Sequence, residues 1–230
     1  MFNYSEFNPL HRELASGEMT TAEFQAFLRK ITQNLVDHSN DGSIHFICMD
    51  WRHIYDLLHS CNPLYTELKN ICIWNKNNGG MGSLYRSKHE MVAVYKNGTS
   101  PHVNNVELGK HGRYRTNVWD YAGQTSPHAY RLEELEMHPT VKPVKMIADA
   151  IYDCSHRGSI ILDPFGGSGS TLIATEEAGR KACLIELEPR YVDVTIDRWQ
   201  RVTKKIAIHA KTGLTFDQMA VDRAEVCFVR

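Results

Sequence analysis

The segment SIILDPFGGSGSTLIA, residues 159–174, contains the pattern that decides the fold of this chain. An apolar run leads to Asp163 and Pro164, and a glycine-rich turn then opens a second apolar run. The segment KACLIELE, residues 181–188, is again typical of a strand. A strand, a glycine-rich turn, a helix over 169–179 and a second strand in this order predict a βαβ unit.

The glycine-rich turn predicts a ligand site, because glycines let the backbone approach a ligand and the amides that open a helix favour a negative group. A P-loop would need a lysine followed by Ser or Thr after its last glycine, and this turn has none. A dinucleotide site has the pattern G-x-G-x-x-G. Gly167 and Gly169 begin that pattern, but Leu172 takes the place of its last glycine. A nicotinamide dinucleotide therefore stays as the weaker alternative.

Glu186 stands near the end of the second predicted strand. An acid at that place can accept hydrogen bonds from the hydroxyl groups of a ribose. We therefore expect a ligand that contains a ribose, and a pyrophosphate less so. The alternative interpretation is an exposed strand end without a ligand.

The remaining predicted elements are helices over 20–38, 53–61, 143–155 and 189–206 and strands over 42–50, 68–76 and 90–96. Thr20 and Glu23 fit a capping box at the start of the first helix. The run 42–50 is too continuously apolar for a strand with one wet face, which favours a strand buried on both faces of a parallel sheet. The stretch 97–137 has no clear period, and the tail from His209 is ambiguous.

Composition excludes several classes of protein. The chain has 230 residues, a net charge of -1 and 42% hydrophobic residues, which is typical of a globular domain and not of a disordered or collagen-like chain. It has no 18-residue apolar run, so no membrane span is predicted. Its six cysteines form no CxxC pair, and its histidines form no HExxH motif. We therefore expect no metal site and no disulfide framework, but reduced thiols in a cytoplasmic protein.

Several motifs together resemble the β class of amino-methylating DNA methyltransferases. DPFGGSGS at 163–170 resembles the first motif of that family, IELEP at 185–189 the second, and HPTVKP at 138–143 the tenth. Upstream, SIHFICMDWRH at 43–53 and WNKNNGGMGSLYRSKHEMVAVYK at 74–96 resemble the strands that follow the family's catalytic motif. The resemblance covers residues 11–205, in the family's permuted order of catalytic, target-recognition and cofactor motifs.

The resemblance implies an α/β, Rossmann-like fold of the S-adenosylmethionine-dependent methyltransferases, with a largely parallel sheet and a circularly permuted motif order. It divides the chain into the remainder of a catalytic subdomain (1–96), a target-recognition or loop region (97–137), a cofactor-binding subdomain (138–206) and a C-terminal tail (207–230). The implied function is site-specific methylation of an amino group in double-stranded DNA, with adenine favoured over cytosine as the target base, as in restriction–modification.

The cofactor that the resemblance implies is S-adenosylmethionine. Thr140 and Lys142 would hold its methionine carboxylate, and Glu186 would hold its ribose. Phe165 would flank the sulfonium or the flipped base, unless it is simply a core aromatic. The full set of expected cofactor-binding residues is Thr140, Lys142, Asp163, Pro164, Phe165, Gly166, Gly167, Ser168, Gly169, Ser170 and Glu186.

The stretch 80–120 is the candidate for DNA recognition, because it carries a local charge of +3 in a chain that is nearly neutral. Its aromatic residues are Tyr85, Tyr95, Tyr114 and Trp119, and Tyr121 directly follows it. Basic groups bind phosphates and aromatic rings stack on bases, although such a stretch can also be a solvated face. The expected DNA-binding residues are Arg86, Lys88, Lys110, Arg113, Tyr114 and Arg115.

The family's catalytic motif, an Asp, Asn or Ser followed by Pro-Pro and an aromatic residue, is missing, since the sequence contains no Pro-Pro pair. We therefore predict no catalytic residues, a sheet that lacks one central strand, and little or no activity for the chain as it stands. A truncated gene product, a misplaced start or half of a split enzyme would explain this, with a partner chain or a missing N-terminal segment supplying the motif. The other hypotheses are a non-catalytic module that binds DNA or cofactor, and a nicotinamide-dependent oxidoreductase.

Overall fold

The computed structural model describes residues 19–80, 84–110, 114–123 and 141–228, with side chains up to residue 222. The chain forms two compact units, residues 1–123 and residues 124–230. The division between the units falls inside the stretch 97–137, which the sequence predicts to be a separate region.

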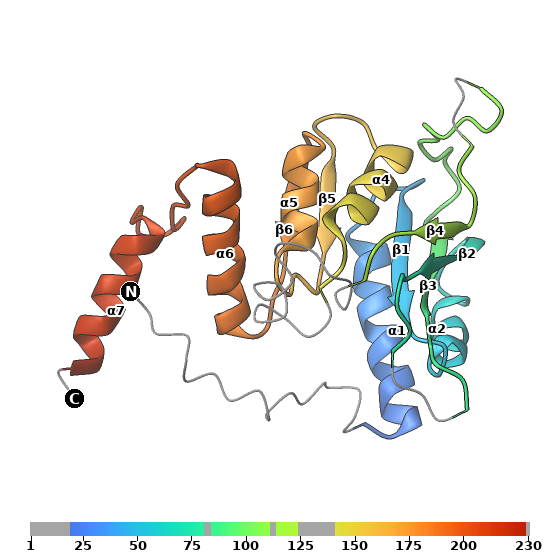
Figure 1. Ribbon diagram of the computed structural model, residues 1–230, viewed down its shortest axis with the longest axis horizontal. Helices are drawn as coiled ribbons and strands as arrows, with labels where there is room; N and C mark the ends of the chain where they lie inside the picture. Colours follow the sequence, from blue (N-terminus) through green and yellow to red (C-terminus); the bar gives the residue numbers. More distant parts are fainter. Residues whose placement is uncertain (1–18, 81–83, 111–113, 124–140, 229–230) are drawn as a thin grey trace. The chain divides into compact units, whose positions relative to one another are not determined.

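The described residues of the first unit form a four-stranded sheet and two helices (Figure 1). Its elements are α1 (Thr21–Asp37), β1 (Ile44–Met49), α2 (Ile54–Cys61), β2 (Glu67–Asn75), β3 (His89–Lys96) and β4 (Val118–Asp120). The strand order is β1-β3-β2-β4. Strands β1 and β2 both run antiparallel to β3, and β4 runs parallel to β2. The sheet is therefore mixed.

Strand β1 differs from its prediction as a strand within a parallel sheet. It pairs antiparallel with β3, lies at the end of the described strand order, and has six half-buried residues. It is β3 that is buried continuously, over residues 92–95, because it lies between β1 and β2. A continuous apolar run indicates how deeply a strand is buried, but it carries no information on the direction of the neighbouring strand.

Helices α1 and α2 bury their apolar sides against this sheet. Phe24 and Leu28 of α1, Leu57 of α2, and Ala93 and Tyr95 of β3 belong to one core cluster. The predicted capping box is confirmed: Thr20 Oγ1 accepts from the Glu23 N–H at 3.4 Å, and the Glu23 carboxylate accepts from the Thr20 N–H at 2.8 Å. Local sequence thus starts α1, and core packing holds it on the sheet.

A histidine in β1 is enclosed by hydroxyl groups. His45 Nδ1 lies 2.7 Å from the hydroxyl of Tyr65, and its Nε2 lies 3.0 Å from the hydroxyl of Ser43. Because hydroxyl groups donate or accept as needed, both contacts satisfy the neutral ring. Burial lowers the pKa of His45 to about 4, since the charged form loses its hydration.

Replacement of His45 by glutamine is expected to flatten the pH dependence of stability between about pH 4 and pH 6.5. A histidine whose pKa is depressed in the folded protein stabilises fully above its ordinary pKa, and this contribution is lost as the pH falls toward the folded value. For His45 the change is on the order of 2 kcal/mol. Urea unfolding at several pH values measures it, with the exposed His38→Gln as control. A wild-type slope in His45→Gln would contradict the assignment.

The second unit contains the predicted βαβ arrangement, which is confirmed. Its elements are α4 (Val144–Cys154), β5 (Ile160–Asp163), α5 (Ser170–Glu177), β6 (Lys181–Leu184), α6 (Pro189–Thr203) and α7 (Phe216–Phe228). Strands β5 and β6 pair in parallel, and α5 connects them. Ala148 and Ile151 of α4 form a core cluster with Ala174 of α5 and with Ala178. Helix α7 lies in the tail that the sequence left ambiguous.

The predicted α/β class is confirmed, with a sheet in the first unit that is mixed instead of largely parallel. The absence of one central strand stays a prediction. Within the described residues, no helix combines the length and the hydropathy that a membrane crossing requires.

Candidate cofactor site and nucleic-acid interface

Asp163 fixes the turn between β5 and α5. One carboxylate oxygen accepts from the backbone N–H of Phe165 at 2.9 Å, and the other accepts from the hydroxyl of Thr171 at 2.6 Å. The carboxylate therefore ties the end of the strand to the first turn of the helix. These two hydrogen bonds hold the glycine-rich turn in its conformation.

Glu186 joins this turn to the end of β6. Its Oε2 accepts from the backbone N–H of Gly167 at 2.7 Å, and its Oε1 accepts from the N–H of Glu188 at 2.9 Å. An ionised carboxylate offers about four acceptor positions, so about two stay open beside the turn. These positions suit a pair of hydroxyl donors, which is the chemistry of a ribose.

Helix α6 supports the turn from the other side. Thr195 donates its hydroxyl hydrogen to the carbonyl of Gly167 at 2.8 Å, and the buried Arg198 donates to the carbonyl of Ser168 at 3.0 Å and to the hydroxyl of Ser170 at 3.2 Å. Thr195 and Arg198 are not among the residues predicted from the sequence. Their spacing of three residues, which places them on one face of a helix, is the signal that marks them.

Gly169 is a position of the turn where both the backbone conformation and the space favour glycine. Its φ is +78°, and an added Cβ would lie 2.7 Å from Cγ2 of Thr195. Both the backbone conformation and the close approach of α6 therefore require glycine. The turn can lie this close to α6 only because residue 169 has no Cβ.

The structure brings most of the predicted cofactor-binding residues together in the second unit. Around the turn lie Asp163, Pro164, Phe165, Gly166, Gly167, Ser168, Gly169, Ser170 and Glu186. Phe165 is 58% exposed, so it is not a core aromatic. Ser168 and Ser170 are buried and contact Arg198. Lys142 is half-buried just before α4, and Thr140 lies outside the described residues.

The predicted DNA-binding residues of the first unit divide into two groups. Lys88 and Lys110 are exposed. Arg86 donates to the carbonyls of Gly79 at 2.5 Å and Gly80 at 3.2 Å, so it supports the glycine loop before β3. Arg115 lies over the ring of Trp119 at 5.2 Å and donates to the Tyr121 hydroxyl at 3.1 Å. Arg113 lies outside the described residues.

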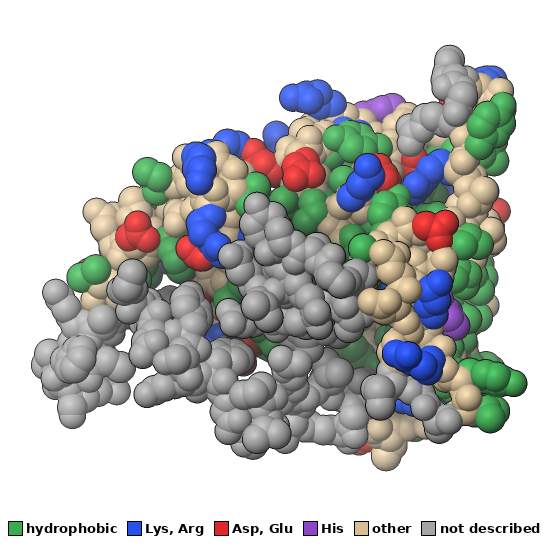
Figure 2. Space-filling model, viewed as in Figure 1, with side chains coloured by type: hydrophobic (Ala, Val, Ile, Leu, Met, Phe, Trp, Pro, Cys, Tyr) green, Lys and Arg blue, Asp and Glu red, His purple; other side chains and the backbone are tan. Residues whose placement is uncertain are grey.

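The aromatic residues of the same stretch also divide. Tyr85 and Tyr114 are 85% and 77% exposed, and their rings are open to a partner. Tyr95 and Trp119 are buried, so the expectation that their rings stack on bases is wrong. On the face shown in Figure 2, Lys and Arg side chains stand singly or in small groups among acidic and hydrophobic ones. The structure thus offers separate cationic and aromatic contacts.

Similarity to solved structures shows which class of fold the chain has. The chain superposes on a crystal structure of an M1.HpyAVI–SAM complex with a TM-score of 0.63 at 21% identity, covering 76% of this chain and 83% of the other. It superposes on the cytosine-N4-specific PvuII DNA methyltransferase with a TM-score of 0.64 at 15% identity, covering 82% and 74%. The chain therefore has the α/β, Rossmann-like fold of these methyltransferases.

The family follows from the sequence itself. The family model of the N6/N4 DNA methylases matches residues 8–197, and the chain belongs to that family. The DNA adenine methyltransferase YhdJ of Escherichia coli K12 is 28% identical in an alignment of 163 residues that covers 60% of this chain and 54% of YhdJ. The chain spans about half the length of YhdJ and of other curated relatives, and less of some.

Proposed function

We propose that this chain contributes the cofactor-binding and DNA-binding parts of an S-adenosylmethionine-dependent DNA methyltransferase that modifies the amino group of adenine, with cytosine as the alternative target. One observation carries the proposal: the carboxylate of Glu186 is bonded to the glycine-rich turn and keeps acceptor positions for ribose hydroxyls. Membership of the DNA methylase family supports it, and the similarity to YhdJ favours adenine.

The residues present suit S-adenosylmethionine, which when bound would supply an electrophilic methyl group at its sulfonium. Glu186 would hold the ribose hydroxyls by charge-assisted hydrogen bonds. The exposed ring of Phe165 would cover the sulfonium side. Thr140 and Lys142 would bind the methionine carboxylate. Thr195 and Arg198 would keep the turn in shape, and Asp163 would do so as part of the cofactor-binding turn itself.

Double-stranded DNA is the proposed partner of the first unit. Lys88 and Lys110, together with Arg113, would bind phosphates, and the exposed rings of Tyr85 and Tyr114 would contact bases. Arg86 and Arg115 would act by positioning the backbone and the rings next to them. The proposed setting is the cytoplasm, where thiols stay reduced. None of the five cysteines whose side chains the structure describes is in a disulfide.

We also propose that the catalytic motif comes from a segment outside these 230 residues, on a partner chain or a preceding segment. The sequence has no Pro-Pro pair. The family's catalytic motif contains such a pair, and it is this motif that would contact the target amine. Coexpression with a chain that carries a DPPY-type motif should raise methyl transfer well above that of the chain alone. Equal transfer by the chain alone would overturn this part of the proposal and leave the methyltransferase function standing.

The function itself is tested by incubating the coexpressed protein with isotopically labelled S-adenosylmethionine and duplex DNA. Nuclease digestion and mass spectrometry then separate N6-methyladenine from N4-methylcytosine. We expect the label on adenine, and no label when Glu186→Ala replaces the wild type. Label on cytosine would correct the target. Unlabelled DNA, together with no binding of S-adenosylmethionine in calorimetry, would contradict the proposed function.

A further inference from the structure

Two exposed aromatic rings that the core does not use lie close together in sequence, one in the turn between β1 and α2 and one at the start of α2. Trp51 is 52% exposed and Tyr55 is 69% exposed. The opposite side of α2 is buried through Asp56, Leu57 and Cys61. Because successive helical residues differ by about 100° around the axis, burial of that side leaves Tyr55 and His59 facing outward. Both are exposed.

Each exposed ring has a partner beside it that suits nucleic acid. The guanidinium of Arg52 lies 5.5 Å from the ring centre of Trp51, and the ring of His59 lies 5.9 Å from that of Tyr55 at an interplanar angle of 17°. Arg52 and His59 are both exposed. A cation and flat rings on one short segment are the combination that binds the backbone and the bases of an unpaired strand.

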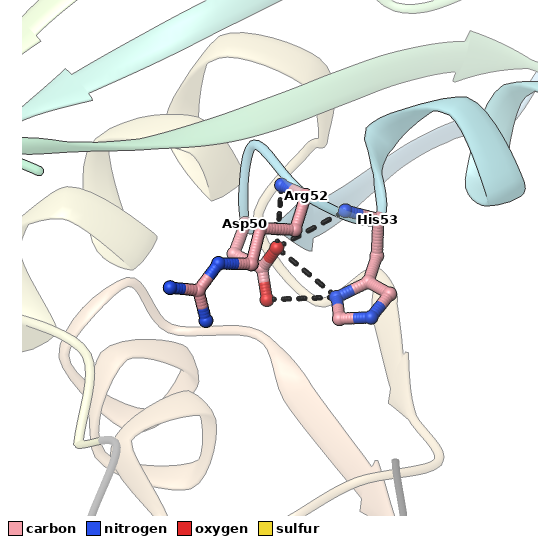
Figure 3. Close-up of polar contacts among 3 residues, drawn as sticks. All are labelled: Asp50, Arg52 and His53. Atoms are coloured by element: carbon pink, nitrogen blue, oxygen red, sulfur yellow. Dashed lines mark hydrogen bonds and ion pairs between the residues drawn. The ribbon is translucent and has the colours of Figure 1, made fainter. Parts of the chain in front are cut away.

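Asp50 makes this turn rigid. Its Oδ1 accepts from the backbone N–H groups of Arg52 at 2.8 Å and His53 at 3.1 Å, and the His53 ring lies 3.1 Å from the same carboxylate (Figure 3). Partial burial alone would raise the pKa of Asp50, but these hydrogen bonds hold it below its usual value. Figure 3 shows the Arg52 guanidinium pointing away from the His53 ring. The carboxylate is thus engaged by the turn, and Arg52 reaches outward.

We propose that Trp51, Arg52, Tyr55 and His59, named here the 51–59 surface, bind an unpaired stretch of DNA by stacking and by a phosphate contact. The inference rests on the proposed function, because a methyltransferase that extrudes its target base leaves the strand locally unpaired. None of these four residues belongs to the basic stretch 80–120. The 51–59 surface is therefore a second DNA contact on the first unit.

The test is the binding of a fluorescein-labelled single-stranded oligodeoxynucleotide to the full chain, followed by anisotropy. Trp51→Ala and Tyr55→Ala should each weaken binding by roughly 5- to 100-fold, and Trp51→Phe should recover much of the loss. The affinity for a fully paired duplex should change less than about threefold, since its base faces are covered. Arg52→Ala should reduce the slope of log affinity against log salt by about 0.7, the value for one phosphate of a single strand.

Tyr152→Ala is the matched control, because Tyr152 is an exposed ring with an arginine, Arg180, at 5.0 Å in the other unit. It should bind the oligonucleotide like the wild type, and circular dichroism should show that all variants are folded. Wild-type affinity in Trp51→Ala and Tyr55→Ala would overturn the proposal. So would equal losses for single-stranded and paired DNA. Because no step depends on methyl transfer, failure of the proposed function is recorded separately by the labelling experiment.

Discussion

Replacement of Glu186 by alanine is expected to weaken the binding of S-adenosylmethionine by at least about 100-fold. A hydrogen bond to a charged group contributes roughly 1.5–3 kcal/mol, and two ribose hydroxyls would lose such a bond. About 1.4 kcal/mol corresponds to a factor of ten in affinity. Isothermal titration calorimetry of the full chain measures the change.

The control must separate the ribose from the turn, because Glu186 also accepts from the Gly167 N–H. Thr195→Val removes a different bond to the same turn, the one to the Gly167 carbonyl, and leaves the acid in place. It should weaken binding much less than Glu186→Ala. Glu186→Ala should also reduce the affinity for a cofactor analogue without the 2′-hydroxyl by a smaller factor than the affinity for S-adenosylmethionine. Equal losses in all these comparisons would show that Glu186 acts only by shaping the turn.

Gly169→Ala is expected to destabilise the second unit by about 3 kcal/mol. An alanine in the left-handed region costs roughly 1–2 kcal/mol, and crowding in a packed site adds about 1–3 kcal/mol. The crowding arises because the new Cβ would lie 2.7 Å from Cγ2 of Thr195. Hydrogen exchange of amides in α5, measured by mass spectrometry, reports the stability of this part of the chain.

Gly158→Ala is the matched control for backbone strain. Gly158 lies in the same unit with a φ of +82°, and an added Cβ would meet nothing within 4 Å. It should cost only the conformational part, about 1–2 kcal/mol. Combining Gly169→Ala with Thr195→Ser, which removes Cγ2 and keeps the hydroxyl, should recover part of the difference. Equal effects of Gly158→Ala and Gly169→Ala would refute the steric explanation.

Elements with local signals were predicted from the sequence within a few residues. The Thr20 capping box starts α1, and the glycine turn between two apolar runs forms the βαβ unit. Strand β4 was missed, because it has three residues and is defined by its pairing with β2 about 45 positions earlier in the chain. A pairing so distant in sequence leaves no periodic pattern to detect.

The residues of the candidate cofactor site were predicted more completely than the α6 residues that hold its turn in place. The turn and Glu186 follow from motif and spacing, whereas Thr195 and Arg198 act only because α6 packs against the turn. In the basic stretch, composition could not separate Tyr85 from Tyr95. One is exposed and the other is fully buried, because β3 places Tyr95 in the core between the helices and the sheet.

The sequence by itself determined the α/β class, the βαβ unit and the glycine turn with its acid, because each depends on neighbours along the chain. Only the tertiary structure decided the antiparallel direction of β1 and β3, the burial of Tyr95 and Trp119, and the support of the turn by α6. These features depend on which segments meet in space. Contacts between residues far apart in sequence fix that choice, and no single segment encodes it.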